Sequence, residues 1–340
     1  MNFSSSTIVY IFILSLFTGC APTRYEQYRD IRAWEIALGS ISKQELPKIS
    51  HKIWMSPDDH VGEMLTERIS LAKNKIDLNV YLLSDVPLIN AIILAHRQGV
   101  FVRIILERSV YGAPTANATV YERLKNEGIS IVWADEVRQN FNHAKYSIID
   151  DVVYLGTANF TTTSFTKNRE FFIETTDKAV LQYMEHIFEA DFYRFPFHGT
   201  EASVYISPID SRIKIEGALR SSQKSIHIFA ASLSDDSLLD ILREKQGDGV
   251  SVQVCLAYET DQERQNLKQV FKSQKIDFKQ VKSPYVHAKT ILIDSHILFI
   301  GSENFTKNSL DQNREIGLIL RESYFVQKYK ETILKDCRDI

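Results

Sequence analysis

Short apolar runs alternate with longer amphipathic stretches along the chain after about residue 50. Runs such as 75–82 and 100–106 are short and rich in β-branched residues, which is typical of buried strands. Stretches such as 86–98 place apolar residues at helical spacing and end at a glycine. The pattern therefore predicts an α/β fold, with mixed sheets flanked by helices.

The predicted elements follow the same order twice. In the first half, helices are expected at 57–74, 86–98 and 120–126, and strands at 75–82, 100–106 and 129–133. In the second half, helices are expected near 215–221, 237–245 and 263–273, and strands at 225–231, 250–257 and 278–281.

The chain also repeats itself in sequence. Residues 75–85 match residues 225–235, and Gly99-Val100 matches Gly249-Val250, in both cases at an offset of 150. The segment 195–208 lacks helical periodicity and divides the copies. We therefore expect two homologous units at 51–195 and 200–340, and a length of 340 residues suits two units of roughly 150.

Polar residues of the same types recur near the end of each unit. The first set is His143, Lys145, Asp150, Gly156, Thr157, Asn159 and Glu170, and the second is His287, Lys289, Asp294, Gly301, Ser302, Asn304 and Glu315. The first three members are offset by 144 and the others by 145. The extra residue falls in the turn at Ser295-His296, where a hairpin can absorb it.

The spacing suits the binding of a phosphate group. Residues i and i+2 of a strand point to one face, so each histidine projects with its lysine. Gly156 and Gly301 permit close backbone approach, and the hydroxyl and the amide that follow add hydrogen-bonding groups. Each copy thus predicts half of a phosphate site, with a nucleophile or acid for the bond. Asp150 and Asp294 are interpreted as structural turn residues, with a catalytic role as the alternative.

The two motifs resemble the phospholipase D superfamily, whose signature is His-x-Lys-x4-Asp with a downstream Gly-Ser-x-Asn. Thr157 stands where serine is usual, and keeps a hydroxyl group. The resemblance covers both repeats, from about residue 50 to the C-terminus. It implies two phospholipase D-like units that pack about a pseudo-twofold axis and share one active site.

The same resemblance implies a two-step mechanism through a phosphohistidine. His143 is expected to be the nucleophile and His287 the general acid and base. Glu170 would orient His287, and Glu315 would orient His143. The groups expected to stabilise the phosphate oxygens are Lys145, Lys289, Asn159 and Asn304.

The N-terminus predicts a compartment. Residues 8–17 form an apolar run that is too short to span a membrane but suits a signal peptide. Thr18-Gly19-Cys20 follows and resembles a bacterial lipobox. We expect a signal peptide at 1–19, lipidation at Cys20 and a tether at 20–50, which would place the protein on the periplasmic side of the outer membrane. An uncleaved anchor or a plain signal peptide are the alternatives.

Composition and charge narrow the function classes. Charged residues make up 24% of the chain and the net charge is −3, which excludes disordered and collagen-like chains and argues against a global basic field for nucleic acid. Three cysteines cannot build a disulfide framework, and Cys255 and Cys337 are interpreted as structural thiols. No metal-binding spacing is present, so neither a metal nor another cofactor is expected.

We therefore expect a metal-independent phosphodiesterase that hydrolyses or transfers the phosphodiester of a phospholipid. A nuclease acting on DNA or RNA and a non-catalytic binding lipoprotein are the alternatives. Because both motifs lie in one chain, a monomer is expected. Two basic stretches near the motifs, Lys167-Asn-Arg169 and Lys307, are expected either to hold a polyanion or to be solvated. The stretches 110–114 and 138–142 are interpreted as ordinary loops, with a role in lining the substrate cleft as the alternative.

Overall fold

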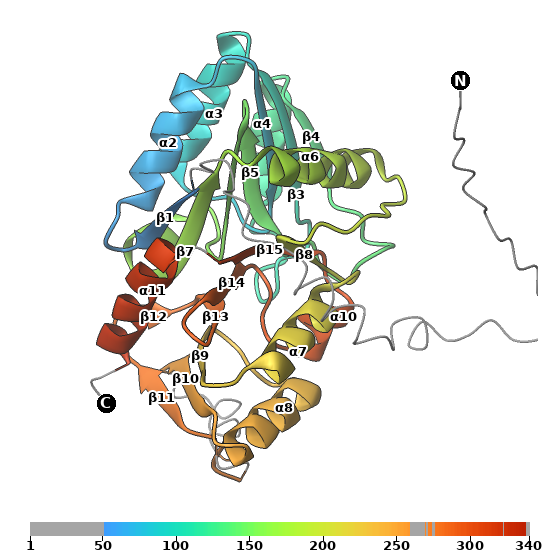
Figure 1. Cartoon of the computed structure of the whole chain (residues 1–340). Coiled ribbons are helices and arrows are strands. Elements are labelled where there is room, and N and C mark those ends of the chain that lie inside the picture. The colour runs from blue at the N-terminus through green and yellow to red at the C-terminus, as the bar shows by residue number, and fades with distance from the viewer. Residues whose placement is uncertain (1–50, 259–268, 270, 274–275, 322, 338–340) are drawn as a thin grey trace, which may run out of the picture. The chain divides into compact units, whose positions relative to one another are not determined.

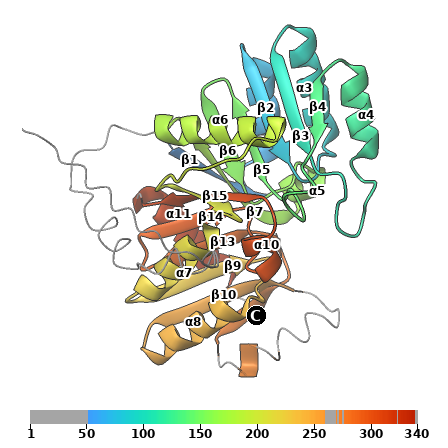
Figure 2. The same cartoon turned by 90° about the vertical axis from the view of Figure 1, so that its right-hand side faces the viewer.

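The computed structural model describes residues 51–258, 269, 271–273, 276–321 and 323–337. The expected signal peptide, the tether with Cys20 and most of the expected helix at 263–273 lie outside these residues. The described residues belong to one compact unit with two sheets, which lie one above the other in Figures 1 and 2.

The first sheet is built from residues of the first half. Its strands, in spatial order, are β1 (His51–Ser56), β7 (Asn168–Thr175), β6 (Val152–Gly156), β5 (Lys145–Ile149), β2 (Lys75–Val80), β3 (Phe101–Leu106) and β4 (Ser130–Trp133). Strands β2, β3 and β4 are parallel, whereas β5, β6, β7 and β1 pair antiparallel, so the sheet is mixed as predicted.

The second sheet repeats this arrangement. Its order is β11 (Phe278–Val281), β10 (Ser251–Ala257), β9 (Ser225–Ala230), β13 (Lys289–Ile293), β14 (Ile297–Gly301), β15 (Glu315–Leu320) and β8 (Val204–Ser207). A further strand, β12 (Tyr285–Val286), leaves the second half and pairs in parallel with β7 of the first.

Helices cover both sheets. Those of the first half are α2 (Val61–Leu71), α3 (Val86–Arg97), α4 (Ala118–Asn126), α5 (Thr162–Thr166) and α6 (Lys178–Tyr193). Those of the second are α7 (Ser211–Ser221), α8 (Asp236–Gly247), α10 (Lys307–Asp311) and α11 (Ser323–Asp336). The expected helix at 57–74 is shorter than predicted, because Asp59 accepts the backbone N–H of Met55 and turns the chain before Val61.

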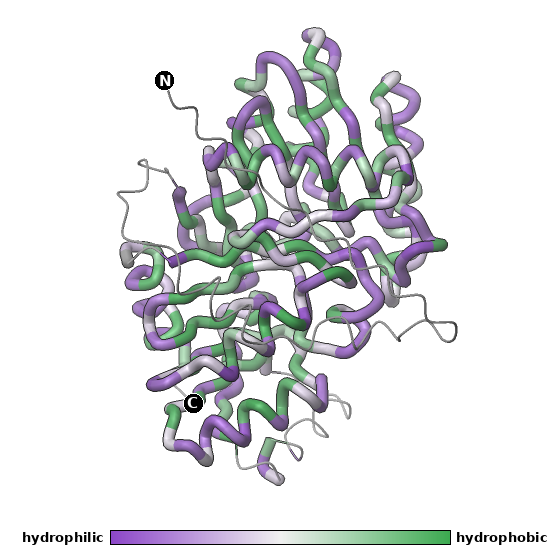
Figure 3. The backbone as a smooth tube through the Cα atoms, turned by 45° about the vertical axis from the view of Figure 1, so that its right-hand side comes forward, coloured by the Kyte–Doolittle hydropathy of each residue, from purple (hydrophilic) through white to green (hydrophobic). Residues whose placement is uncertain are grey.

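Three hydrophobic clusters form the core. One lies under α2, α3 and α4, and one under α7 and α8. The third joins the two halves, since it combines residues of both sheets with the apolar faces of α6 and α11. Figure 3 shows apolar colour concentrated on the strands, whereas the helices alternate between apolar and polar residues. The third cluster makes one body of two homologous halves.

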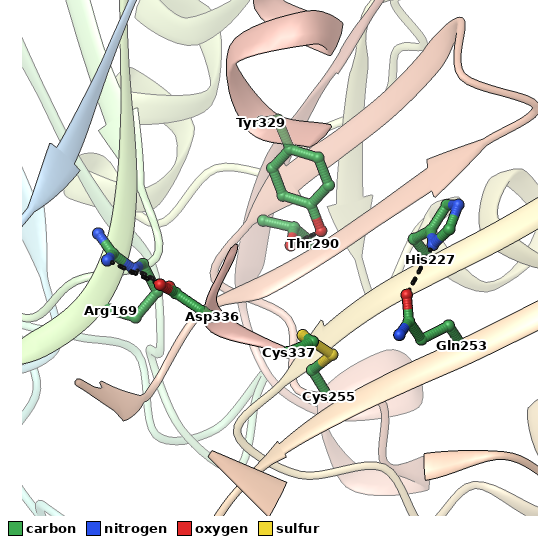
Figure 4. The surroundings of a disulfide bond; sticks show 8 residues. All are labelled: Arg169, His227, Gln253, Cys255, Thr290, Tyr329, Asp336 and Cys337. Atoms are coloured by element: carbon green, nitrogen blue, oxygen red, sulfur yellow. Dashed lines mark hydrogen bonds and ion pairs between the residues drawn. A yellow bond between two sulfur atoms is a disulfide. The ribbon is translucent and has the colours of Figure 1, made fainter. Parts of the chain in front are cut away.

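The structure corrects the interpretation of two cysteines as thiols. Cys255 on β10 and Cys337 at the end of α11 form a disulfide, with their Cα atoms 6.2 Å apart and 82 residues apart in sequence (Figure 4). Each cysteine is fully buried, as expected for a structural residue. The pair could not be predicted from local pattern because it depends on where α11 packs. The residue before Cys337 is Asp336, which forms an ion pair with Arg169 of the first half.

Candidate active site

Each motif histidine lies at the junction of the halves. His143 and His287 come two residues before β5 and β13, in short segments that cross to the other half. The backbone N–H of His143 donates to the carbonyl of Arg314 at 2.9 Å, and that of His287 donates to the carbonyl of Arg169 at 3.2 Å. The fold thus brings the two motifs together by reciprocal parallel pairing, since Asn142 pairs with Arg314 as β12 pairs with β7.

Both histidines contact a glutamate of the opposite half. Nδ1 of His143 is 2.8 Å from Oε2 of Glu315, and Nδ1 of His287 is 2.7 Å from Oε1 of Glu170. The glutamates are fully buried, whereas the imidazoles keep side-chain exposures of 12% and 21%. Because Nδ1 faces a carboxylate in each ring, Nε2 is the nitrogen that does not contact a glutamate and is the candidate for chemistry.

The sequence motif also supplies the groups that hold each glutamate. Asn168 donates to Glu170 at 3.2 Å, and Asn313 donates to Glu315 at 3.1 Å. The hydroxyl of Thr157 donates to the second oxygen of Glu170 at 2.6 Å. The sequence predicted that this hydroxyl would contact phosphate oxygens. Thr157 is instead fully buried, and its hydroxyl orients the carboxylate.

The two lysines lie beneath the histidines. Lys145 and Lys289 are each 1% exposed, and each ammonium donates to the backbone carbonyl of the histidine two residues before it. Nζ of Lys289 lies 3.2 Å from both ring nitrogens of His287, and Nζ of Lys145 lies 5.1 Å from the ring centroid of Tyr81. The two imidazoles and two ammonium groups therefore lie close together, and the carboxylates that hydrogen-bond to the imidazoles are those of Glu170 and Glu315.

Burial shapes the protonation of these groups. It lowers the pKa of His143 to about 4 and that of Lys289 to about 8, and it lowers the pKa of Lys145 well below its ordinary value. Burial likewise lowers the pKa of His287. For Glu170, burial alone would raise the pKa, but His287 and its other donors bring it below the ordinary value. A bound phosphate anion would favour the charged forms of the lysines, so the site is suited to an anionic ligand.

Asn159 and Asn304 occupy equivalent positions, three residues after the ends of β6 and β14. Both side chains are partly exposed, and in both the amide oxygen is buried with no hydrogen-bond partner among the described residues. An amide oxygen accepts hydrogen bonds, whereas phosphate oxygens need the Nδ2 donor of the same amide, so a role of these residues in phosphate binding stays a prediction.

The remaining motif residues have structural contacts. A Cβ at Gly156 would lie 2.3 Å from the carbonyl oxygen of Phe171, so only glycine fits there, and Gly301 is similarly crowded. Ser302 accepts the backbone N–H of Ile316 at 3.0 Å.

The two motif aspartates lie at the far ends of the strands that follow the histidines. Asp150 accepts three backbone N–H groups, those of Lys73, Asn74 and Lys75, in the turn after β5. Asp294 accepts three equivalent N–H groups in the turn after β13. These contacts correspond to the turn role and place neither carboxylate at the histidines.

Arg169 is not a surface cation, which corrects the expectation that it holds a polyanion or is solvated. It is 2% exposed and forms ion pairs with Asp58 and Asp336, both at 2.6 Å. Its counterpart Arg314 pairs with Asp191 of the first half at 2.9 Å. Lys307 is exposed and pairs with Asp311 at 2.8 Å.

Sequence reasoning recognised Asn168-Arg169 and Asn313-Arg314 as repeated neighbours of the glutamates, but it missed Tyr81, Asp191 and Asp336. Asp191 and Asp336 also repeat at the offset of 145, so this signal could have found the two residues, although it does not give their arginine partners. Tyr81 has no such partner, and its ring packs edge-on against His143 with centroids 4.6 Å apart.

Two kinds of feature are absent from the described residues. Among them, no group of three or more His, Cys, Asp or Glu side chains is placed to hold a metal ion. No helix in the described part of the chain is both long and apolar enough to cross a bilayer.

Comparison with solved structures identifies the fold. A polyphosphate kinase from Porphyromonas gingivalis superposes with a TM-score of 0.68 at 16% identity, over 85% of this chain and 47% of that one. A phosphatidylserine synthase from Haemophilus influenzae superposes with a TM-score of 0.65 at 10% identity, over 84% of this chain and 86% of that one.

Curated relatives share part of the sequence. The chain is 34% identical to a minor cardiolipin synthase of Bacillus subtilis over 38% of its own length and 33% of that protein. It is 26% identical to a mitochondrial cardiolipin hydrolase of Xenopus laevis, and 30% identical to a phospholipase D of Rickettsia conorii, over 35% of its length in each case. The chain covers 54% and 60% of those two proteins, so it spans between one third and three fifths of the length of these relatives.

A family description matches both halves of the chain. It is named "Cardiolipin synthase, PLD-like domain" and covers residues 65–192 and 215–337, which include both motifs. Together with the two sheets related by the repeat, this match shows that the chain belongs to the phospholipase D superfamily.

Proposed function

We propose that this protein is a metal-independent phosphodiesterase of the phospholipase D type that acts on a phospholipid through a phosphohistidine. The observation that carries the proposal is the pair of crossed His–Glu contacts, 2.8 and 2.7 Å long, above two buried lysines. One active site that needs both halves offers a nucleophile, an acid and a cationic pocket for one phosphodiester.

The proposed first step uses the histidines in different roles. Nε2 of neutral His143 attacks phosphorus, and the bond from phosphorus to the leaving oxygen breaks as the imidazolium of His287 gives that oxygen its proton. The low pKa of His143, about 4 through burial, supports its role as the neutral nucleophile. Glu170 accepts three hydrogen bonds and so remains a carboxylate, which supports the imidazolium of His287.

In the second step the neutral His287 takes a proton from water or from an acceptor alcohol. The oxygen attacks phosphorus, the N–P bond breaks, and both histidines return to their starting states. Lys145, Lys289, Asn159 and Asn304 would bind the equatorial oxygens. Hydrolysis and transfer differ only in the acceptor, so we propose the chemistry for both.

An exposed apolar rim beside the histidines supports a lipid substrate. Val137 is 94% exposed and Tyr111 is 82% exposed, more than the other large hydrophobic residues among those described, and Phe195 is 59% exposed. Such side chains on loops suit contact with a bilayer surface.

Contacts place these loops together and next to the site. Arg138 donates to the carbonyl of Phe195 at 2.7 Å, and Arg108 lies 3.4 Å from Glu136. Tyr111 donates its backbone N–H to the hydroxyl of Tyr81, whose ring contacts His143. The two stretches interpreted from sequence as ordinary loops thus border the histidines, which supports the alternative that they line the cleft.

We also propose that the protein is a monomer anchored through Cys20 on the periplasmic side of the outer membrane. The apolar run and the lipobox-like Thr18-Gly19-Cys20 support this location. A disulfide between Cys255 and Cys337 agrees with it, because disulfides persist in oxidising compartments such as the periplasm. Loss of lipid labelling in Cys20→Ser, with the mass of a monomer in detergent, is the expected result.

The substrate is tested by giving the purified full chain phospholipid vesicles, single-stranded DNA and double-stranded DNA in separate reactions with EDTA. Release of headgroup without cleavage of DNA supports the proposal, whereas DNA cleavage without headgroup release would replace it with a nuclease. His143→Ala and His287→Ala should each abolish turnover, and His186→Ala, on the exposed side of α6, is the matched control. Radiolabel trapped on His143 would identify the nucleophile.

A further inference from the structure

The two halves differ at one buried position inside the motif. The residue between the hydroxyl residue and the asparagine is Ala158 in the first half and Glu303 in the second. Both are buried, with exposures of 0% and 1%. A carboxyl group has therefore been placed in the interior of one half only, close to the catalytic groups.

The residues around Glu303 also differ from those around Ala158 in the first half. Ser211, the first residue of α7, donates its hydroxyl to Oε1 of Glu303 at 3.0 Å. The first residue of α2, at the equivalent place in the first half, is the buried apolar Val61. The donor is thus present only where the acid is present.

Tyr205 adds a second polar group. A Cβ built on Gly301 would lie 2.4 Å from Oε2 of Glu303 and 2.5 Å from the hydroxyl of Tyr205, so these oxygens lie within about 5 Å of each other. Tyr205 pairs in register with Gly317, and a Cβ on Gly317 would lie 2.0 Å from the tyrosine ring. The glycine therefore makes the space that Tyr205 occupies.

The first half has no such space. At the equivalent register Trp54 pairs with Phe172, which is fully buried. We call Tyr205, Ser211 and Glu303 the acid cluster. Its counterparts in the first half are Trp54, Val61 and Ala158. The two halves therefore differ at three neighbouring positions together, which argues that the acid has a functional role and does not merely fill space.

The geometry favours a proton on Glu303. Its Oε2 is buried and has no hydrogen-bond partner among the described residues, and a buried carboxylate oxygen without a donor is costly as an anion. Burial first, and then the charge of Glu315, raise the pKa of Glu303 well above its ordinary value.

Other elements packed against Glu303 do not supply a dedicated cation. Asp210 precedes α7 and is paired with Lys214 at 2.8 Å, and Lys145 is shared with the catalytic carboxylates. The titratable and charged groups that face Glu303 or act on it are Glu315 on β15, Asp210 before α7, Tyr205 on β8 and Lys145 on β5.

We propose that Glu303 is a positioning residue that holds a proton beside Glu315 and thereby makes the His143–Glu315 pair inequivalent to the His287–Glu170 pair. The inference deepens the two-histidine mechanism proposed above and rests on it. While Glu303 is neutral, His143 faces one negative charge, which suits a neutral nucleophile. Ionisation of Glu303 would add a second negative charge and draw a proton toward His143. Glu170 has Ala158 at the matching place and experiences no such change.

The test is an NMR titration of the Cε1–H resonances of both histidines in the full chain, assigned with His143→Ala and His287→Ala. The lysines beside the rings also titrate on the alkaline side, so the readout is the difference between wild type and Glu303→Gln. We expect the wild-type His143 curve to contain an alkaline inflection that is lost in Glu303→Gln, and the His287 curve to be the same in both proteins. A His143 curve that Glu303→Gln leaves unchanged, or an equal change in both histidines, would overturn the proposal.

Ser211→Ala provides a second variant that does not touch the acid itself. The Ser211 hydroxyl lowers the pKa of Glu303, so its removal should move the inflection to higher pH. No movement would count against the proposal even if Glu303→Gln does not fold. Glu244→Gln, an exposed acid on α8, should leave both curves unchanged. The titration does not depend on turnover, so it can fail while the histidine variants support the proposed function, or succeed while they do not.

Discussion

Replacement of Glu170 by glutamine tests how the two halves share one site. The change keeps the shape of the side chain and removes a charge 2.7 Å from Nδ1 of His287. Unit charges about 4 Å apart interact by about 4 kcal/mol at an effective dielectric constant near 20. The imidazolium of His287 should therefore lose about 2–4 kcal/mol of stabilisation, and the pKa of His287 should fall further below its ordinary value.

The direction of the change in the pKa of His287 follows from the negative charge of Glu170. A carboxylate favours the imidazolium, so Glu170→Gln lowers the pKa of His287 and leaves less of the general acid at neutral pH. We expect kcat for a chromogenic phosphodiester in EDTA to fall by about 30-fold to 10³-fold. The pH above which the acid form is lost should also move down.

The histidine whose pKa changes in Glu170→Gln distinguishes the crossed arrangement from contacts within one half. Glu170 belongs to the same half as His143, but it contacts His287. NMR titration should therefore show a lowered pKa for His287 with His143 unchanged, and Glu244→Gln should change neither. A shift at His143 instead, or full activity in Glu170→Gln, would refute the crossed arrangement as the basis of catalysis.

Three further predictions concern stability, measured by urea unfolding. Cys255→Ser opens an 82-residue loop and should cost about 2–5 kcal/mol, whereas equal stability with and without reductant would contradict it. Asp191→Ala leaves the side chain of Arg314 with only the carbonyl of Ser207, so the free energy of unfolding should fall by about 3–5 kcal/mol. Asp336→Ala should lower it by less, because Arg169 keeps its ion pair with Asp58. The reverse order of the two losses would be inconsistent with these contacts. Asp150→Ala leaves three N–H groups without their acceptor and should cost about 1–3 kcal/mol at neutral pH. Burial alone would raise the pKa of Asp150, but those three donors lower it, so this difference should vanish as the pH falls through that pKa; a difference that persists in acid would argue against it.

The sequence predicted the parts of the fold that depend on local pattern and on repetition. Strands such as β2 and β9 are short apolar runs with clear boundaries, and the offset of 150 identified them as equivalent. The alternation of strands and helices also predicted mixed sheets flanked by helices, whereas the order of the strands came from the structure. The two histidines, two lysines and two glutamates were found in the same way, because each occurs twice at fixed spacing.

Contacts between distant segments could not be predicted in this way. The disulfide joins β10 to the end of α11, and Asp191 and Asp336 reach across to the arginines of the opposite half. Each depends on the packing of a helix, which residue spacing along one strand does not encode. A comparison of the two repeats also finds only residues that occur in both, so it overlooked Glu303, whose counterpart is alanine.

The reciprocal contacts between the halves resemble those of a symmetric dimer. The His143–Arg314 and His287–Arg169 backbone bonds exchange equivalent groups, as an isologous interface does. In a true homodimer, any substitution appears on both sides of the twofold axis, so the two sides of a shared site must remain identical. Because both halves of this protein lie in one chain, that constraint does not apply. Ala158 and Glu303 can therefore differ, and each side of the site can be specialised for its own step.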